Sequence, residues 1–193
     1  MWKFRSKKNL LNTPLRILLV TNSLVLLAGG MIGPIYALFV EDIGGSILDA
    51  SFAGAMFALA AGVTTFISGK YADHNKHKEK IVVFGYLVMG AGFMLYTLVN
   101  SIFTLMIVQV IIGFGEAIYL PAFDAVYSKH LDHNKEGQQW GAWESVYYFA
   151  TAIGAAVGGY IVVYSGFNLM FILMALLCLG SALYIYRLPK KAI

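Results

Sequence analysis

The segment Ile102–Val126 has the sequence IFTLMIVQVIIGFGEAIYLPAFDAV, in which the only charged residues are Glu116 and Asp124. A helix that crosses a bilayer needs about 20 consecutive, mostly apolar residues, so this segment is long enough and apolar enough to cross one. Further runs of this kind occur along the chain, separated by short polar breaks. The six predicted spans cover approximately residues 15–40, 49–69, 81–99, 102–126, 140–164 and 168–186. The sequence therefore predicts an all-α polytopic membrane protein, with a single six-helix transmembrane domain over residues 1–193.

The composition of the chain is too apolar for a soluble domain. Hydrophobic residues make up 59% of the sequence and charged residues 12%, whereas about a quarter of the residues in soluble domains are charged. The excess apolar surface must face lipid. A membrane β-barrel would show ten-residue segments of alternating polarity, which the long apolar runs do not. The single cysteine, Cys178, excludes an intrachain disulfide.

The basic residues all fall on one side of the six-span arrangement. The fourteen lysines and arginines are Lys3, Arg5, Lys7, Lys8, Arg16, Lys70, Lys76, Lys78, Lys80, Lys129, Lys135, Arg187, Lys190 and Lys191. The opposite links carry only the acids Glu41, Asp42 and Asp49. Because positively charged loops stay in the cytoplasm, we expect a multi-pass protein of the plasma (cytoplasmic) membrane with both termini in the cytoplasm. Each basic cluster abuts a span, so we interpret it as a contact with lipid headgroups and predict no nucleic-acid partner.

Small residues recur at four-residue spacing in several predicted spans. Lipid tails do not drive helices together, so close packing relies on small residues that let backbones approach. The stripes are Gly29, Gly33 and Ala37; Gly54, Ala58 and Gly62; and Ala150, Gly154 and Gly158. We interpret these stripes as helix contacts. Pro34 removes a backbone donor from the first span and should kink it.

The link after the second span carries a recognisable pattern. Residues 69–78 have the sequence GKYADHNKHK, in which a glycine, a small residue, an aspartate and basic residues follow one another. This segment resembles the loop signature of the major facilitator superfamily at Gly69, Ala72, Asp73 and Lys78. Where that family usually has arginine, glycine and a further basic residue, this chain has His74, Lys76 and His77.

Two further segments resemble the same family in the expected order. Gln109–Gly115 is similar to the fourth-helix pattern, with Gln109 where arginine is common. Gly154–Tyr160 is similar to the fifth-helix antiporter pattern, with alanine in place of its usual proline. The resemblance implies that Gly154, Gly158 and Gly159 form a helix-packing motif. Gly166-Phe167 and Phe171 resemble the start of the sixth helix.

The resemblance covers nearly the whole chain, but only the amino-terminal six helices of the usual twelve. In this family the substrate path lies between two six-helix halves, so one half supplies half of the cavity wall. Several assemblies are compatible with the sequence: a parallel homodimer, a pair with a separately encoded second half, or a truncated product without transport. The basic end Arg187–Lys191 favours a genuine half-length protein.

Glu116 is the strongest candidate for a functional residue, because ionisable residues within a bilayer are costly and usually line a cavity or pair. Gln109, Gly113 and Glu116 share one helix face, and the resemblance implies that the fourth helix lines the transport path. We predict that Glu116 binds a proton or a cation. The alternative is a structural carboxyl bonded to a neighbouring helix.

Other polar residues are weaker candidates for the same path. Asn22 and Tyr36 share a face of the first span, where Asn22 could equally join two helices. Glu144 and Tyr148 share a face of the fifth span and could form the inner mouth of a cavity. The alternative for Glu144 is an interfacial acid that pairs with a nearby lysine or histidine.

The loop after the second span is a candidate gate. The resemblance implies that Asp73 joins the cytoplasmic ends of the two halves, where it could accept bonds from a helix amino terminus. Gly69, His74, Lys76 and Lys78 complete this predicted conformational-gate loop. The alternative is a solvated loop without such a role.

The predicted function is secondary active transport. No nucleotide-binding loop is visible, so a proton or ion gradient would drive transport or efflux of small molecules by alternating access after two halves pair. The alternative is a non-transporting fragment, scaffold or accessory subunit that binds another transporter half. We expect no enzyme activity, no catalytic residue and no cofactor. We also expect no metal site, since His130 and His133 lie in a short link where histidines are usually solvated.

Overall fold

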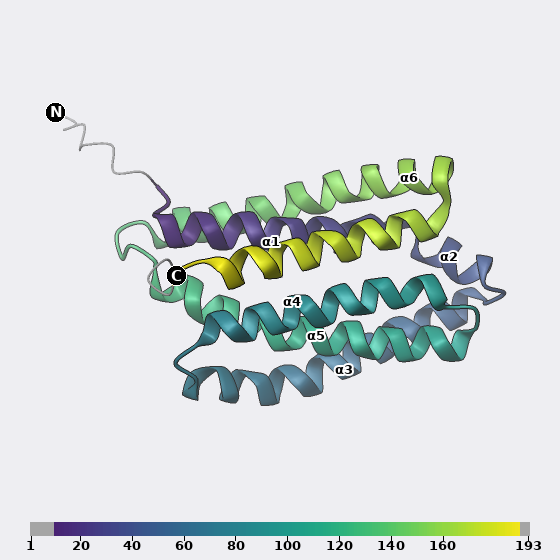
Figure 1. Cartoon of the computed structure of the whole chain (residues 1–193), viewed down its shortest axis with the longest axis horizontal. Helices are drawn as coiled ribbons and strands as arrows, with labels where there is room; N and C mark the ends of the chain where they lie inside the picture. The colour runs from purple at the N-terminus through teal and green to yellow at the C-terminus, as the bar shows by residue number, and fades with distance from the viewer. Residues whose placement is uncertain (1–9, 190–193) are drawn as a thin grey trace.

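A computed structural model describes residues 10–189, which form a bundle of long helices joined by short links (Figure 1). In chain order the elements are α1 (Thr13–Ile32), the 3-10 turn η1 (Gly33–Ile35), α2 (Tyr36–Asp42), α3 (Ile47–His74), α4 (Lys78–Leu95), the 3-10 turn η2 (Tyr96–Leu98), α5 (Ile102–Lys129) and α6 (Glu136–Arg187). No strand occurs in this range. The predicted all-helical polytopic class is confirmed.

Local sequence signals fix where several helices begin. Ser46 caps α3 by accepting a bond from the Asp49 N–H, and the Asp49 carboxylate accepts from the Ser46 N–H in return. Ser101 and Thr104 form the same reciprocal box at the start of α5. Such boxes satisfy backbone donors that have no partner in the first helical turn. The predicted breaks before residues 49 and 102 are therefore encoded locally.

Within residues 10–189 five helices are long and apolar enough to cross a membrane, whereas we predicted six separate ones. They are Thr13–Asp42, Ile47–His74, Lys78–Leu98, Ile102–Lys129 and Glu136–Arg187. The difference lies in α6, which includes both the fifth and the sixth predicted spans. Only Gly166 leaves the helical conformation there, with φ 80° and ψ 172°. The chain doubles back at that glycine (Figure 1), because glycine adopts a positive φ without steric cost.

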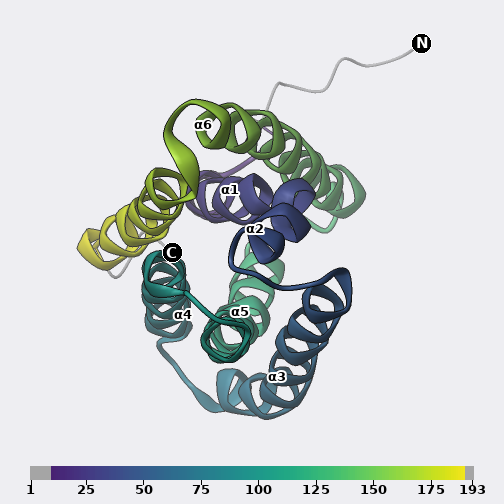
Figure 2. The same ribbon diagram turned by 90° about the vertical axis from the view of Figure 1, so that its right-hand side faces the viewer.

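The two halves of α6 enclose α1. We call residues 136–165 the first limb and residues 167–187 the second limb, and α1 lies between them (Figure 2). Along the first limb, a Cβ added to Gly154 would stand 2.4 Å from the Leu27 carbonyl oxygen. On the second limb, the Ser181 hydroxyl donates to the Thr21 carbonyl oxygen at 3.0 Å. α1 is thus held by close backbone approach on one side and by a buried hydrogen bond on the other.

The link after the second span is shorter than predicted. We expected residues 70–80 to be non-helical, but α3 continues to His74 and α4 begins at Lys78. Asp73 and His74 therefore lie in the last turn of α3. Hydropathy marks where the apolar run ends, whereas a helix continues into the headgroup region as long as its backbone bonds are satisfied. The same effect starts α6 at Glu136, ahead of the predicted residue 140.

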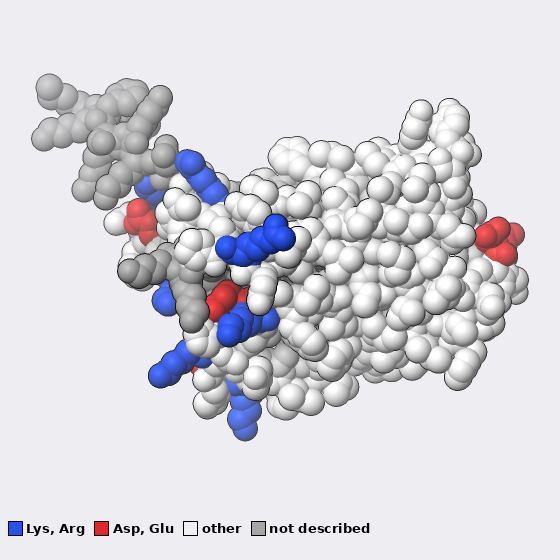
Figure 3. Space-filling model, in the orientation of Figure 1, with Lys and Arg blue, Asp and Glu red and all other residues white. Residues whose placement is uncertain are grey.

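Charge is segregated along the long axis of the bundle. Figure 3 shows lysine and arginine side chains gathered at one end of the molecule, while the opposite end of this face carries acidic side chains only. The described basic residues are Arg16, Lys70, Lys76, Lys78, Lys80, Lys129, Lys135 and Arg187. Lys3, Arg5, Lys7, Lys8, Lys190 and Lys191 lie outside the described residues. A visible surface without charged side chains in its middle and with charged side chains at its ends matches the profile of a bilayer.

A polar cluster at the basic end ties the start of the chain to the link between α5 and α6. The Gln139 side chain, 2% exposed, donates to the Leu10 carbonyl oxygen and accepts from the Asp132 N–H, both at 2.8 Å. The Asn12 amide donates to the His130 carbonyl oxygen at 2.8 Å. These bonds hold the links that lead into α1 and α6.

We expect Gln139→Leu to lower the stability of the purified protein by about 1–3 kcal/mol, because it leaves a backbone donor and acceptor without their partner. Thermal unfolding in detergent measures the effect. Gln138→Leu is the matched control, since Gln138 is exposed. Equal melting temperatures for the two variants would contradict the structural role of Gln139.

Candidate functional site

A pocket of about 350 Å³ lies where α1, α2, α3, α4 and α5 meet, and we call it the central pocket. It is lined by Gly29, Ile32, Gly33, Tyr36, Gly54, Phe57, Met89, Phe93, Tyr96, Gln109, Ile112 and Glu116. Three of the predicted path residues, Tyr36, Gln109 and Glu116, therefore share one cavity. Most of the wall is apolar, and the few polar groups are of the kind that orient a bound molecule.

Glycines leave the pocket open. No atom lies within 4 Å of the position that a Cβ would occupy at Gly29, Gly33 or Gly54. We predicted that these glycines form helix contacts, and the structure corrects this, because they border empty space instead. Close approach occurs elsewhere: a Cβ on Gly113 would stand 2.5 Å from the Phe57 backbone oxygen. That contact brings α5 against α3 and forms one side of the pocket.

A hydrogen bond crosses the pocket from α2 to α5. The Gln109 amide donates to the Tyr36 hydroxyl at 2.5 Å, and Gln109 is only 6% exposed. Tyr36 directly follows η1, the turn that contains Pro34 and separates α1 from α2, and this turn positions Tyr36 at the pocket. The predicted kink at Pro34 therefore has a consequence for the site, since it sets the direction in which α2 presents Tyr36.

Glu116 stands two helical turns from Gln109 on the same face of α5, about 10 Å along the axis. Its side chain is partly buried. Within residues 10–189 the Glu116 carboxyl makes no hydrogen bond or ion pair. A carboxyl in an apolar cavity without a fixed partner can bind a proton or a cation that enters the cavity.

An aromatic cluster supports the far wall of the pocket. Tyr96, in η2, stacks on Phe171 of α6 with ring centroids 4.7 Å apart. Phe39 of α2 meets Phe171 edge-on at 4.9 Å. Sequence reasoning missed Tyr96 and Phe93 as lining residues. Their spacing resembles that of ordinary core residues, so only the packing of α4 against α5 and α6 could reveal them.

The remaining path candidates lie elsewhere. Asn22 is buried between α1 and α4, where its side-chain oxygen accepts from the Tyr86 hydroxyl at 3.0 Å. It occupies the helix-joining position that was its alternative interpretation. Glu144 and Tyr148 are exposed on the first limb of α6 and do not line the central pocket. Glu144 and Tyr148 could line a transport path only if a further structural element lay opposite them and formed its other wall.

The predicted gate residues cluster at the basic end of α3. Gly69, Asp73 and His74 belong to the last turns of α3, and only Lys76 lies in the link to α4. The Lys78 amino group donates to the Ala72 carbonyl oxygen, which joins the ends of the two helices. Asp73 is exposed. Its carboxylate is accessible to a partner beyond the described residues.

The residues considered for a metal do not converge. His130 contacts the Val126 carbonyl oxygen through Nδ1 at 2.8 Å, and His133 contacts the Glu136 carboxylate at 2.9 Å. Within residues 10–189 no three histidine, cysteine, aspartate or glutamate side chains gather in a geometry suited to a metal ion.

The glycine pattern of the first limb has a clear structural role at two of its three positions. A Cβ on Gly154 or Gly158 would stand 2.4 Å from the Leu27 oxygen or 2.3 Å from the Met31 oxygen, respectively. Gly159 has no neighbour within 4 Å of its Cβ position. The contact with α1 therefore uses the four-residue stripe, and Gly159 faces away from it.

Comparisons with known proteins agree with these features. The family model described as Major Facilitator Superfamily matches residues 18–193. The chain is 26% identical over 171 residues to the multidrug resistance protein MdtG of Erwinia billingiae, covering 86% of this chain and 41% of that protein. It is 29% identical over 159 residues to the proton-coupled antiporter flippase LtaA of Staphylococcus saprophyticus, covering 78% of this chain and 38% of that protein. The chain thus spans about two fifths of the length of these curated relatives.

Proposed function

The chain belongs to the major facilitator superfamily, and from this premise we propose that it forms one half of a proton-linked secondary transporter of small molecules. In this proposal two six-helix halves pair and alternate between inward-open and outward-open states. The two limbs of α6 count as separate crossings, which gives six. The basic end of the bundle faces the cytoplasm, with both termini on that side of the plasma membrane.

The observation that carries the proposal is the carboxyl of Glu116 in the central pocket. It is an ionisable group within the apolar part of the bundle, has no partner among residues 10–189, and shares a cavity with Gln109 and Tyr36. Such a group is costly in a bilayer unless it binds something. If a proton and a cationic or hydrophobic substrate bind at this carboxyl in turn, proton transport is coupled to substrate transport.

The exposed surface of α3 supports the need for a second half. α3 packs mainly against α5. Of the most apolar 18-residue stretch of α3, only 6% is buried within the chain. Phe52, Leu59 and Phe66 are each more than half exposed on this helix. A second half laid over α3 and the first limb of α6 would close the central pocket and bring Glu144 and Tyr148 to its mouth. Asp73 would then face the partner's helix ends.

The relatives favour export within this proposal. The names of two of them refer to multidrug resistance and to proton-coupled antiport. An exporter of hydrophobic or cationic molecules fits a mostly apolar pocket with a single carboxyl. The second half would be another copy of this chain or a different polypeptide. The competing function is that of a non-transporting accessory subunit, favoured by the same exposed face of α3.

We expect the purified chain to form a stable dimer in lipid nanodiscs over a range of protein-to-disc ratios. We further expect it to accumulate tetraphenylphosphonium in proteoliposomes with an acidic interior, because an outward proton gradient would drive the cation inward. Native mass and cation uptake are the two measurements. A monomer at every ratio, together with uptake no greater than in empty vesicles, would overturn the homodimeric transporter and leave the accessory subunit.

A further inference from the structure

A second hollow, about 540 Å³, lies on the outer side of the bundle between α3, α4 and α5. α3 and α4 each pack on α5 but diverge from one another (Figure 2), so that α5 forms the floor of a groove between them. We call it the outer groove. It is lined by Thr64, Ile67, Ser68, Tyr71, Asn75, His77, Lys80, Ile81, Phe84, Phe114 and Ile118. None of these residues lines the central pocket.

The two ends of the outer groove differ in chemistry. One end has apolar walls formed by Ile67, Phe84 and Phe114, which are all exposed. The other end carries polar side chains, among them Asn75 and Lys80. An apolar channel with a polar mouth is suited to an amphipathic molecule, since a fully polar or fully apolar one would match only part of it.

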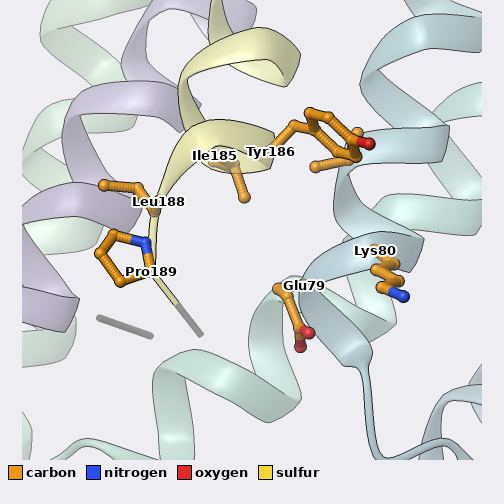
Figure 4. A pocket seen from close by; sticks show the side chains of 7 residues that line it. Glu79, Lys80, Ile185, Tyr186, Leu188 and Pro189 are labelled. Atoms are coloured by element: carbon orange, nitrogen blue, oxygen red, sulfur yellow. The ribbon is translucent and has the colours of Figure 1, made fainter. Parts of the chain in front are cut away.

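The polar mouth is positively charged. Four lysines lie between residues 70 and 80, with only the carboxylates Asp73 and Glu79 to offset them. Glu79 is engaged by the His77 imidazole at 3.1 Å. Lys80 has no ion pair among the described residues. In Figure 4 the Lys80 amino group points away from the end of α6 and away from the Glu79 carboxylate. The mouth therefore offers an unpaired ammonium group to an anion.

The length of the groove matches one leaflet of a bilayer. Thr64 on α3 and Asn75, the residue directly after α3, mark its two ends, and a rise of 1.5 Å per residue places them about 16 Å apart. Half of the hydrocarbon core of a bilayer is about 15 Å thick. A lipid with its phosphate at Lys80 would therefore extend an acyl chain along the groove to the level of Thr64, near the bilayer centre.

We propose that the outer groove binds an anionic phospholipid of the leaflet at the basic end. The phosphate of this lipid pairs with Lys80. Asn75 and Tyr71 surround the headgroup. One acyl chain lies over Phe114, between Ile67 and Phe84. The charge of the mouth selects an anionic over a zwitterionic headgroup, and the apolar channel selects a lipid over a soluble phosphate. A lipid at this place would fill the space between α3 and α4 and stabilise their separation.

Native mass spectrometry of the full chain in detergent, titrated with dioleoyl phosphatidylglycerol, tests the proposal. We expect a retained lipid and about fivefold weaker binding in Lys80→Gln, because one basic residue near a membrane surface contributes a factor of that size. Lys76→Gln is the matched control. It removes the same charge four residues earlier, from the link between α3 and α4, but Lys76 does not line the groove. We expect it to bind the lipid as the unmodified chain does.

A second variant tests the apolar channel independently of charge. Thr64→Trp fills the deep end while keeping Lys80, and we expect it to weaken lipid retention without changing the helical circular dichroism spectrum. Equal weakening by Lys76→Gln and Lys80→Gln would show diffuse attraction and overturn the site. Equal retention of dioleoyl phosphatidylcholine would overturn the selection of charge. Competition by free glycerol phosphate at the same concentration as lipid would overturn the selection of a lipid.

Discussion

Gly158→Ala lowers the stability of the purified protein by roughly 1–3 kcal/mol or more, the range for overpacking a tight contact. The added Cβ would stand 2.3 Å from the Met31 carbonyl oxygen and 2.7 Å from the Met31 Cα. These are backbone atoms of α1, so no side-chain rotation can relieve the clash, and the helices must separate. Because packing in membranes relies on close van der Waals contact, separation weakens the whole contact between α1 and the first limb of α6.

Thermal unfolding in detergent, followed by circular dichroism, measures this loss. Gly159→Ala is the control, since it makes the same chemical change one residue later, where no atom lies within 4 Å of the Cβ position. An alanine in place of glycine also favours a helix intrinsically, so the control should be neutral or slightly more stable. If Gly158→Ala and Gly159→Ala have the same melting temperature, α1 and α6 do not pack as described here.

Glu116→Gln abolishes the part of transport that a pH gradient drives. Glutamine keeps the size and hydrogen-bonding capacity of the side chain, but it can neither release a proton nor neutralise a cation. If the carboxyl in the central pocket carries the coupling proton, cation accumulation in acid-loaded proteoliposomes falls to the level of empty vesicles. Binding of a neutral hydrophobic substrate would persist, because the apolar walls are unchanged.

Glu136→Gln is the matched control for this variant. Glu136 is an exposed carboxylate at the start of α6, outside the central pocket, and its only described ion pair is with His133. Proton-driven uptake by this variant should equal that of the unmodified chain. Undiminished uptake by Glu116→Gln would remove Glu116 from the mechanism. A lower melting temperature with normal coupling would assign it the structural role instead.

The sequence predicted the membrane class and the approximate spans well, because lipid thickness sets the length of an apolar run directly. It was less accurate where a helix leaves the hydrocarbon. α3 continues to His74 and α6 begins at Glu136 because polar helical turns remain stable in the headgroup region. The fifth and sixth predicted spans both lie in α6, on either side of Gly166, where a single residue reverses the chain.

The candidate site was predicted only in part. Helical spacing placed Gln109 and Glu116 on one face of α5, and the structure brings Tyr36, predicted on the first span, into the same pocket. Asn22 has the same chemistry as other path residues, yet a hydrogen bond to Tyr86 holds it between α1 and α4. The partner of a polar side chain comes from another helix, so its identity depends on how the helices are arranged.

The order of apolar and charged residues was enough to predict a helical membrane protein, the places of its apolar spans and the basic end of the bundle. Each of these follows from local composition measured against the thickness and charge of a bilayer. Which glycines form contacts and which border space depends on the packing of the helices: Gly154 and Gly158 touch α1, whereas Gly29, Gly33 and Gly54 open the central pocket. The stripes look alike in sequence, because a missing side chain allows either a neighbouring backbone or a cavity, and the rotation of each helix within the bundle selects between them.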